Sequence, residues 1–276
     1  MADLVLEDGR ALRYYDSGEP GDSGLDSEVA LLWHHGSPQT GAPLEPVVRA
    51  ARARGIRLLS YGRAGYGGST ALDGRDVASA ASDVRAIVDA LGVERFAVMG
   101  ASGGGPHALA CAALLPERVV AAVSIAGLAP YGHADWFAGM ADDGALRAAL
   151  QGREARERFE ETAEFDEDSF TAADYAALAG GWSSLNDDVR ATDAFGSGGL
   201  VADDLAFVAP WGFSPDTITA PVLLAHGSED RVVPSAHSRW LLDILPAAEL
   251  WVRPRDGHIS VLDAIPVAMD WVLDRT

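Results

Sequence analysis

Lysine is absent from this 276-residue chain: its 21 basic residues are all arginine, against 41 aspartate and glutamate residues. A Walker phosphate loop needs a lysine, and so does Schiff-base chemistry, so both are excluded. The net charge of −20 also argues against nucleic-acid binding, because that affinity depends on lysine and arginine side chains that neutralise phosphates. We therefore expect a small-molecule substrate and no nucleic-acid partner.

Cysteine is nearly absent as well. The single Cys111 cannot form an internal disulfide, and thiol-rich metal sites are impossible. We expect Cys111 to be buried, because it lies within an apolar run, and we expect no metal site. The N-terminus lacks the basic and apolar regions of a secretory signal, which favours a cytoplasmic protein. The apolar window from Phe96 to Leu115 is interrupted by Gly and Pro, which predicts strand, turn and helix rather than a membrane span.

Short apolar runs alternate with longer segments of helical periodicity through most of the chain. The expected strands are a hairpin of Leu4–Leu6 and Ala11–Tyr15, followed by Val29–Trp33, Ile56–Ser60, Phe96–Met99, Val119–Ile125, Pro221–Ala225 and Glu249–Val252. The expected helices are Leu44–Arg54, Val77–Leu91, Pro106–Leu115, Ala236–Leu245 and Ser260–Leu273. Continuous Val, Ile and Leu runs are typical of strands buried on both faces. The alternation predicts an α/β fold with a parallel sheet.

The alternation stops between about Tyr131 and Trp211. This segment has no strand-like run, and it carries acidic helical stretches over Ala145–Thr162, Thr171–Ala179 and Val201–Val208. About eighty residues is too long for a plain crossover between two strands. The sequence therefore predicts a core of residues 1–130 and 212–276, with residues 131–211 inserted as a helical cap.

The strongest chemical signal is Gly100-Ala101-Ser102-Gly103-Gly104, which stands directly between an expected strand and an expected helix. A strand-to-helix turn sharp enough to project a serine hydroxyl needs small neighbours, so that the two elements can approach each other. Pro106 suits the first turn of the helix, where the missing N–H costs no hydrogen bond. We interpret Ser102 as a nucleophile.

A serine nucleophile needs a base and a carboxylate that orients the base. Asp230 and His258 both follow expected strands, and parallel sheets place their sites at the carboxyl ends of the strands. Glu229 and Asp256 compete with Asp230, which we favour because Asp256 is only two residues from His258. Of the seven histidines, His258 alone follows the final strand. We expect Asp230 and His258 to complete the site.

The segment His34-His35-Gly36-Ser37-Pro38 follows the strand expected over Val29–Trp33. A backbone N–H in this loop, that of Ser37, is in a position to pair with the N–H of Gly103 just after the nucleophile. Two such donors stabilise the oxyanion that develops in acyl transfer. We predict an oxyanion hole formed by Ser37 and Gly103.

Taken together, the strings HHGSP, YGRAGYGGS, GASGG, HGSEDRVVP and DGH resemble the α/β-hydrolase superfamily over nearly the whole chain outside the cap. The resemblance implies an α/β-hydrolase fold: a mostly parallel, doubly wound sheet of about eight strands with an inserted cap. It implies an ester, thioester, lactone or amide substrate, an acyl-enzyme on Ser102, and no cofactor. Within YGRAGYGGS, Gly62 replaces an Asp of the family pattern, and we assign this turn a structural role.

The cap suggests where a small, apolar substrate binds. Its aromatic residues and its first histidine give four candidates: Trp136, Phe137, Trp182 and His133. The cap acids Glu160, Glu161 and Glu164 partly resemble those that bind a substrate amine in proline iminopeptidases, so an aminopeptidase is one alternative. A ligand-sensing protein that retains the triad is another. We expect a monomer or a homodimer.

Overall fold

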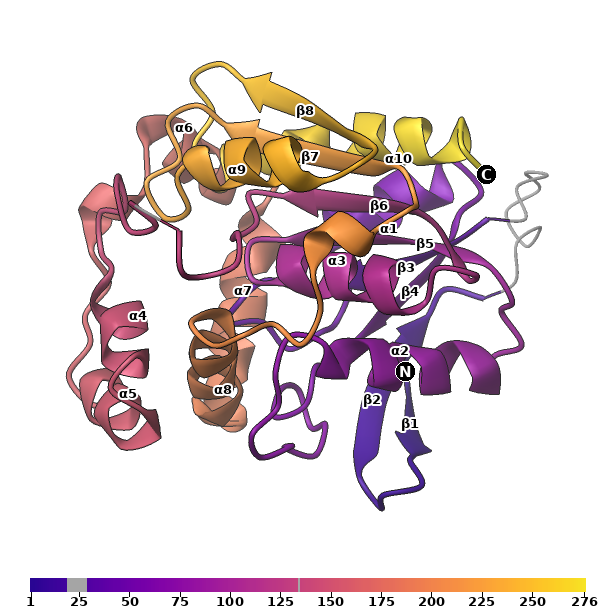
Figure 1. Ribbon diagram of the computed structural model, residues 1–276, viewed down its shortest axis with the longest axis horizontal. Coiled ribbons are helices and arrows are strands. Elements are labelled where there is room, and N and C mark those ends of the chain that lie inside the picture. The colour runs from indigo at the N-terminus through magenta and orange to yellow at the C-terminus, as the bar shows by residue number, and fades with distance from the viewer. Residues whose placement is uncertain (19–28, 134) are drawn as a thin grey trace.

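The computed structural model describes residues 1–18, 29–133 and 135–276 (Figure 1). Residues 19–28 of the predicted core and residue 134 of the predicted cap lie outside the described residues. Eight strands form one sheet in the order β1-β2-β4-β3-β5-β6-β7-β8. Their bounds are Ala2–Val5, Ala11–Asp16, Ala30–His34, Arg57–Tyr61, Phe96–Ala101, Val119–Ile125, Val222–Gly227 and Ala248–Arg253 for β1 to β8.

The six strands from β3 to β8 pair in parallel, and only β1 and β2 join antiparallel. The hairpin turns at Asp8-Gly9, where Gly9 has a φ of 85°, a left-handed conformation that glycine adopts without strain. The predicted fold, a mostly parallel sheet of about eight strands, is confirmed.

Helices cover both faces of the sheet. The core helices are α1 (Glu45–Arg52), α2 (Ser79–Ala90), α3 (Gly104–Leu114), α9 (Ala236–Ile244) and α10 (Ile265–Leu273). In Figure 1, α2, α3 and α9 lie in front of the sheet and α1 and α10 behind it. Neighbouring strand residues pack into opposite layers: Leu32 joins the cluster under α2 and α3, and Leu31 joins the one under α1 and α10. This double burial explains why the strands lack polar alternation.

Two expected helices differ in detail from the observed ones. Helix α3 begins at Gly104, two residues before the prediction, with Pro106 still in its first turn. The helix expected over Ser260–Leu273 starts as a 3₁₀ turn, Ser260–Ala264, before α10. Cys111 lies on α3 and is buried, as predicted.

Between β6 and β7 the described residues contain helices and no strand. The main ones are α4 (Gly144–Ala149), α5 (Arg153–Glu160), α6 (Ala172–Ala179), α7 (Ser183–Ala191) and α8 (Gly198–Phe207). The single helix expected over Ala145–Thr162 is split into α4 and α5, because Gly152 adopts a left-handed φ of 98°. The separation of this segment as a cap remains a prediction.

The apolar window from Phe96 to Leu115 forms β5, a turn and α3, as predicted. In the described ranges, no helix has both the length and the apolar character needed to cross a bilayer.

Candidate active site

Ser102 lies in the sharp turn between β5 and α3. Its φ is 52°, a conformation that costs a non-glycine residue energy and that clusters at functional sites. The glycines around it allow the strand and the helix to approach. A Cβ on Gly100 would lie 2.2 Å from the Gly104 carbonyl oxygen, and a Cβ on Gly104 would lie 2.1 Å from that of His34. The turn therefore requires glycine at both positions, and it lifts Ser102 out of the line of the strand.

Three loops that are distant in the chain meet at Ser102. The Ser102 hydroxyl is 2.9 Å from His258 Nε2, and His258 Nδ1 is 2.8 Å from Asp230 Oδ2. The Nδ1–H donates to the carboxylate, so Nε2 is left as the acceptor for the serine proton. This tautomer is the one that a general base needs. His258 and Asp230 are buried, whereas Ser102 is partly exposed.

The Asp230 carboxylate is held in place from three directions. Its Oδ1 accepts hydrogen bonds from the N–H groups of Val232 and Val233, each at 2.9 Å. His226 Nε2 lies 3.4 Å from Oδ2 and 2.6 Å from the Val233 carbonyl oxygen. Burial opposes ionisation, but the neighbouring His258 outweighs it and holds the pKa of Asp230 well below its usual range. Asp230 is therefore the ionised partner of His258.

Neither rival acid occupies this position. The Asp256 carboxylate accepts a hydrogen bond from Arg253 Nε at 2.5 Å, and the Glu229 side chain is exposed. The structure thus brings Ser102, His258 and Asp230 together, and their catalytic roles remain predictions.

The loop that carries Ser37 lies directly against the Ser102 turn. A Cβ on Gly36 would lie 3.6 Å from Ser102 Cβ, and a Cβ on Gly103 would lie 2.4 Å from Ser37 Oγ. In the described part of the chain, neither the Ser37 N–H nor the Gly103 N–H donates a hydrogen bond. Both amides remain available to an oxygen at the site, as an oxyanion hole requires.

Two of the four predicted substrate-binding residues, Trp136 and Trp182, are buried. Trp136 and Trp182 are only 2% and 3% exposed, and their indole N–H groups donate to the Ala129 carbonyl and to Asp263. Large aromatic rings complete cores as readily as they line sites, so contact of these two side chains with a substrate remains a prediction.

Of the other two candidates, His133 stacks on Trp240 at 5.0 Å between ring centroids. His133 and Phe137 line a surface cavity of about 470 Å³. Among the described residues, the lining of this cavity does not include Ser102, His258 or Asp230. Direct contact of these two side chains with a substrate remains a prediction.

Sequence reasoning missed two residues of α8 that reach the site. The Phe207 ring lies against Gly103, with its Cζ 3.1 Å from the position of a Cβ. Asp203 is completely buried and accepts a hydrogen bond from the Ser37 hydroxyl at 2.5 Å. The sequence signal for Asp203 was its place, with Asp204, among the apolar residues of the acidic helical stretch expected over Val201–Val208, where a buried charge needs a partner.

Over residues 1–18, 29–133 and 135–276, no group of three His, Cys, Asp or Glu side chains is arranged to hold a metal ion.

The chain is similar to known hydrolases. The family model described as "alpha/beta hydrolase fold" matches residues 29–265. A 2-hydroxy-6-oxononadienedioate/2-hydroxy-6-oxononatrienedioate hydrolase of Comamonas testosteroni is 26% identical over 247 residues, which cover 84% of this chain and 82% of the relative. A bifunctional esterase/perhydrolase of Acinetobacter calcoaceticus is 32% identical over 132 residues, 47% of this chain and 46% of the relative.

Among solved structures, the enol-lactonase of Burkholderia xenovorans LB400 superimposes with a TM-score of 0.73 at 21% identity, covering 99% of this chain and 98% of the other. The family model spans most of the chain, and the mostly parallel eight-stranded sheet is consistent with it. The chain therefore belongs to the alpha/beta hydrolase family and is an enzyme of the hydrolase class.

Proposed function

We propose that the protein is a serine hydrolase that cleaves a carboxylic ester, or a related thioester, lactone or amide, through an acyl-enzyme on Ser102. The observation that carries the proposal is the hydrogen-bonded series from the Ser102 hydroxyl through His258 to Asp230. The hydrolase, esterase and lactonase activities named for the similar proteins support this substrate range.

The reaction proceeds in two steps. Ser102 Oγ attacks the substrate carbonyl carbon while His258 Nε2 takes the hydroxyl proton, and the Ser37 and Gly103 amides hold the resulting oxyanion. His258 gives the proton to the leaving alcohol as the bond to carbon breaks. A water molecule then repeats the sequence on the acyl-enzyme, with His258 as base, and releases the acid and free Ser102.

Within this proposal, residues 131–211 form a cap over the site. Helix α8 supports this role, because Phe207 and Asp203 reach the loops that carry Gly103 and Ser37. We propose a small, apolar substrate, since an aromatic ring from the cap lies at the serine turn.

The proposal is tested by replacing Ser102 with alanine and measuring hydrolysis of nitrophenyl esters of increasing acyl length. We expect turnover to fall by about 10⁶-fold, the size seen when a triad nucleophile is lost. A fluorophosphonate should label the wild type at Ser102 and leave Ser102→Ala unlabelled. The matched control is Ser183→Ala, an exposed serine of α7, which should keep full activity. Retention of most turnover by Ser102→Ala would show that the proposal is wrong.

The two alternatives are separated by the same assays. Among the three cap acids invoked for an aminopeptidase, Glu160 already accepts a hydrogen bond from Arg156 at 2.8 Å, which weakens its case as an amine ligand. Faster cleavage of aminoacyl-nitroanilides than of esters would favour the aminopeptidase. Negligible turnover of every ester, together with a bound protein partner, would favour the sensor.

A further inference from the structure

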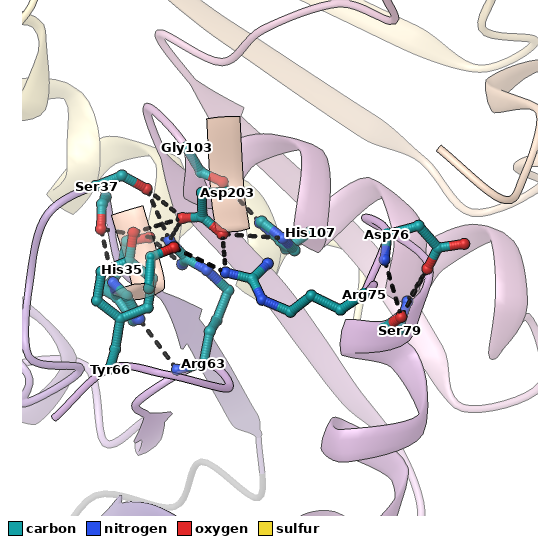
Figure 2. Close-up of polar contacts among 12 residues, drawn as sticks. His35, Ser37, Arg63, Tyr66, Arg75, Asp76, Ser79, Gly103, His107 and Asp203 are labelled. Atoms are coloured by element: carbon teal, nitrogen blue, oxygen red, sulfur yellow. Dashed lines mark hydrogen bonds and ion pairs between the residues drawn. The ribbon is translucent and has the colours of Figure 1, made fainter. Parts of the chain in front are cut away.

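A buried ionic cluster lies behind the predicted oxyanion hole, and the proposed mechanism does not use it (Figure 2). Its centre is Asp203 of α8, whose side chain has no exposed surface. Asp203 Oδ1 accepts from Arg75 Nη2 at 2.6 Å. Asp203 Oδ2 accepts from Arg63 Nη2 at 2.6 Å, from Tyr66 Oη at 2.9 Å and from Ser37 Oγ at 2.5 Å.

The cluster forms several hydrogen bonds with the loop that carries Ser37. Arg63 Nη2 donates to Ser37 Oγ at 2.9 Å, and Arg63 Nη1 donates to the His35 carbonyl oxygen. The Arg63 N–H donates to His35 Nε2 at 3.2 Å. The loop is therefore held by Arg63 and by Asp203 of α8, and these two side chains meet at the Ser37 hydroxyl.

The other predicted oxyanion donor contacts the same cluster. His107 Nδ1–H donates a hydrogen bond to the Gly103 carbonyl oxygen at 2.7 Å, and His107 Nε2 lies 3.9 Å from Asp203 Oδ1. Burial, with Arg63 nearby, lowers the pKa of His107 to about 3, so this imidazole is neutral. Figure 2 shows Ser37 on one side of Asp203 and His107 on the other, with Gly103 above Asp203.

The charges keep Asp203 ionised and in place. Burial opposes its ionisation, but Arg63 and Arg75 outweigh burial and hold the pKa of Asp203 well below its usual range. Both guanidinium groups are nearly inaccessible, at 2% and 4% exposure, so a substrate does not reach them. Buried ion pairs of this kind have sharply defined geometry, because each charge depends on its partners.

The contact between α8 and the core is close. A Cβ on Gly65 would lie 3.2 Å from Gly199 Cα, and a Cβ on Gly199 would lie 2.8 Å from the Gly65 carbonyl oxygen. The start of α8 thus packs against the turn 61–69, to which the sequence assigned only a structural role. This packing places Asp203 within hydrogen-bond distance of Ser37.

We propose that Asp203 is a positioning residue for the oxyanion hole: the cap, through this carboxylate, sets the Ser37 loop against Gly103 in the geometry that acyl transfer needs. The inference rests on the proposed function. Because an error of about 1 Å in such a donor costs on the order of 10²-fold in rate, a residue that touches no substrate controls turnover.

The test compares Asp203→Asn with Asp204→Asn. Asp204 is the adjacent buried carboxylate on α8, and it pairs with Arg156 inside the cap at 2.6 Å rather than with a catalytic loop. Each variant is assayed on the best nitrophenyl ester, with active sites counted by fluorophosphonate titration so that any misfolded fraction is removed. Binding is measured with a trifluoromethyl ketone of the same acyl chain, to which Ser102 adds reversibly to give an oxyanion.

We expect Asp203→Asn to lower kcat per active site by about 10²-fold, the size of losing one oxyanion donor, with KM changed by less than about threefold. Its affinity for the ketone should fall by a similar factor. Asp204→Asn should retain both values within about threefold, since its site touches neither donor. Equal kcat per active site and equal ketone affinity in Asp203→Asn and Asp204→Asn would overturn the proposal.

If Asp203→Asn does not fold, Ser37→Ala tests the same proposal. It removes the hydroxyl that Asp203 holds and leaves the backbone donor and the buried ion pairs. We expect kcat to fall on the order of tenfold, the contribution of one hydrogen bond, and ketone affinity with it. Unchanged kcat and ketone affinity would overturn the proposal. Loss of turnover in Ser102→Ala establishes the proposed function separately, so a failure of the positioning role is distinguishable from a failure of that function.

Discussion

His258 combines two opposing influences at the scale of a single residue. Burial disfavours its imidazolium form, but the ionised Asp230 carboxylate at 2.8 Å outweighs burial, and the pKa of His258 lies above its ordinary value. The neutral imidazole is the form that acts as base. The kcat/KM should therefore rise with pH as His258 loses its proton, and this rise should occur at a higher pH than the titration of an ordinary histidine.

Replacing Asp230 with Asn tests this balance. Without the carboxylate the imidazolium loses its stabilising partner, so the acid limb of the profile of kcat/KM against pH should move to lower pH. The plateau should fall by about 10⁴-fold, because the amide favours the wrong tautomer.

The matched control is Asp256→Asn, the rival acid in the loop that carries His258, whose partner is Arg253. It should leave the limb and the plateau nearly unchanged. A limb that moves in Asp256→Asn and stays in Asp230→Asn would reverse the assignment of the acid.

At the scale of elements, three helices between β6 and β7 each contribute a buried or half-buried aspartate that contacts a loop at the carboxyl end of the sheet. Asp174 of α6 accepts from the N–H groups of Ile259 and Ser260, each at 2.8 Å, directly after His258. Asp188 of α7 accepts from the Thr40 N–H at 3.2 Å, and Asp203 of α8 accepts from Ser37. Helices α6, α7 and α8 are thus hydrogen-bonded to the loops that carry His258 and Ser37.

The β5–α3 junction makes an element-scale prediction. Gly104→Ala would place a Cβ 2.1 Å from the His34 carbonyl oxygen, which is backbone and cannot move aside. We expect the free energy of unfolding, measured by urea denaturation, to fall by about 3 kcal/mol, at the upper end of overpacking costs.

Gly198→Ala on α8 is the control, because a Cβ there meets no described atom within 4 Å. Its free energy of unfolding should change by less than about 1 kcal/mol. Equal stability of the two variants would show that the junction has room for a side chain.

At the scale of the whole molecule, the net charge of −20 is carried mainly by exposed carboxylates. Mutual repulsion of exposed charges destabilises a compact state, and salt screens it within a Debye length of about 10 Å at 0.1 M. The buried pairs of Asp203 with Arg63 and Arg75 are shielded from salt, so screening should act mainly on the repulsion.

We therefore expect the Tm at pH 7.5 to rise by a few degrees when NaCl is raised from low concentration to about 0.3 M, since about 1 kcal/mol shifts the Tm of a chain this size by about 2 °C. At pH 5 the negative net charge is smaller, and the gain should shrink. A Tm that falls with NaCl at pH 7.5 would mean that exposed ion pairs contribute more than repulsion.

The sequence alone determined the parallel sheet, the hydrolase family and the positions of the serine turn and of its two distant partner loops. These features are local: apolar runs mark strands, and Gly100-Ala101-Ser102-Gly103-Gly104 marks a turn that only small residues permit. The roles of Ser102, Asp230, His258, Ser37 and Gly103 follow from those positions and await the experiments above.

The tertiary structure decided what depends on contacts between segments far apart in the chain. Asp203 and Ser37 are separated by 166 residues, and no periodicity or spacing relates them. Likewise, burial of Trp136 and Trp182 arises from packing that an aromatic residue in a sequence does not reveal. A motif such as the serine turn is determined by neighbouring residues in the sequence. The partner of a buried charge is determined by the tertiary fold, because only the fold removes that charge from water.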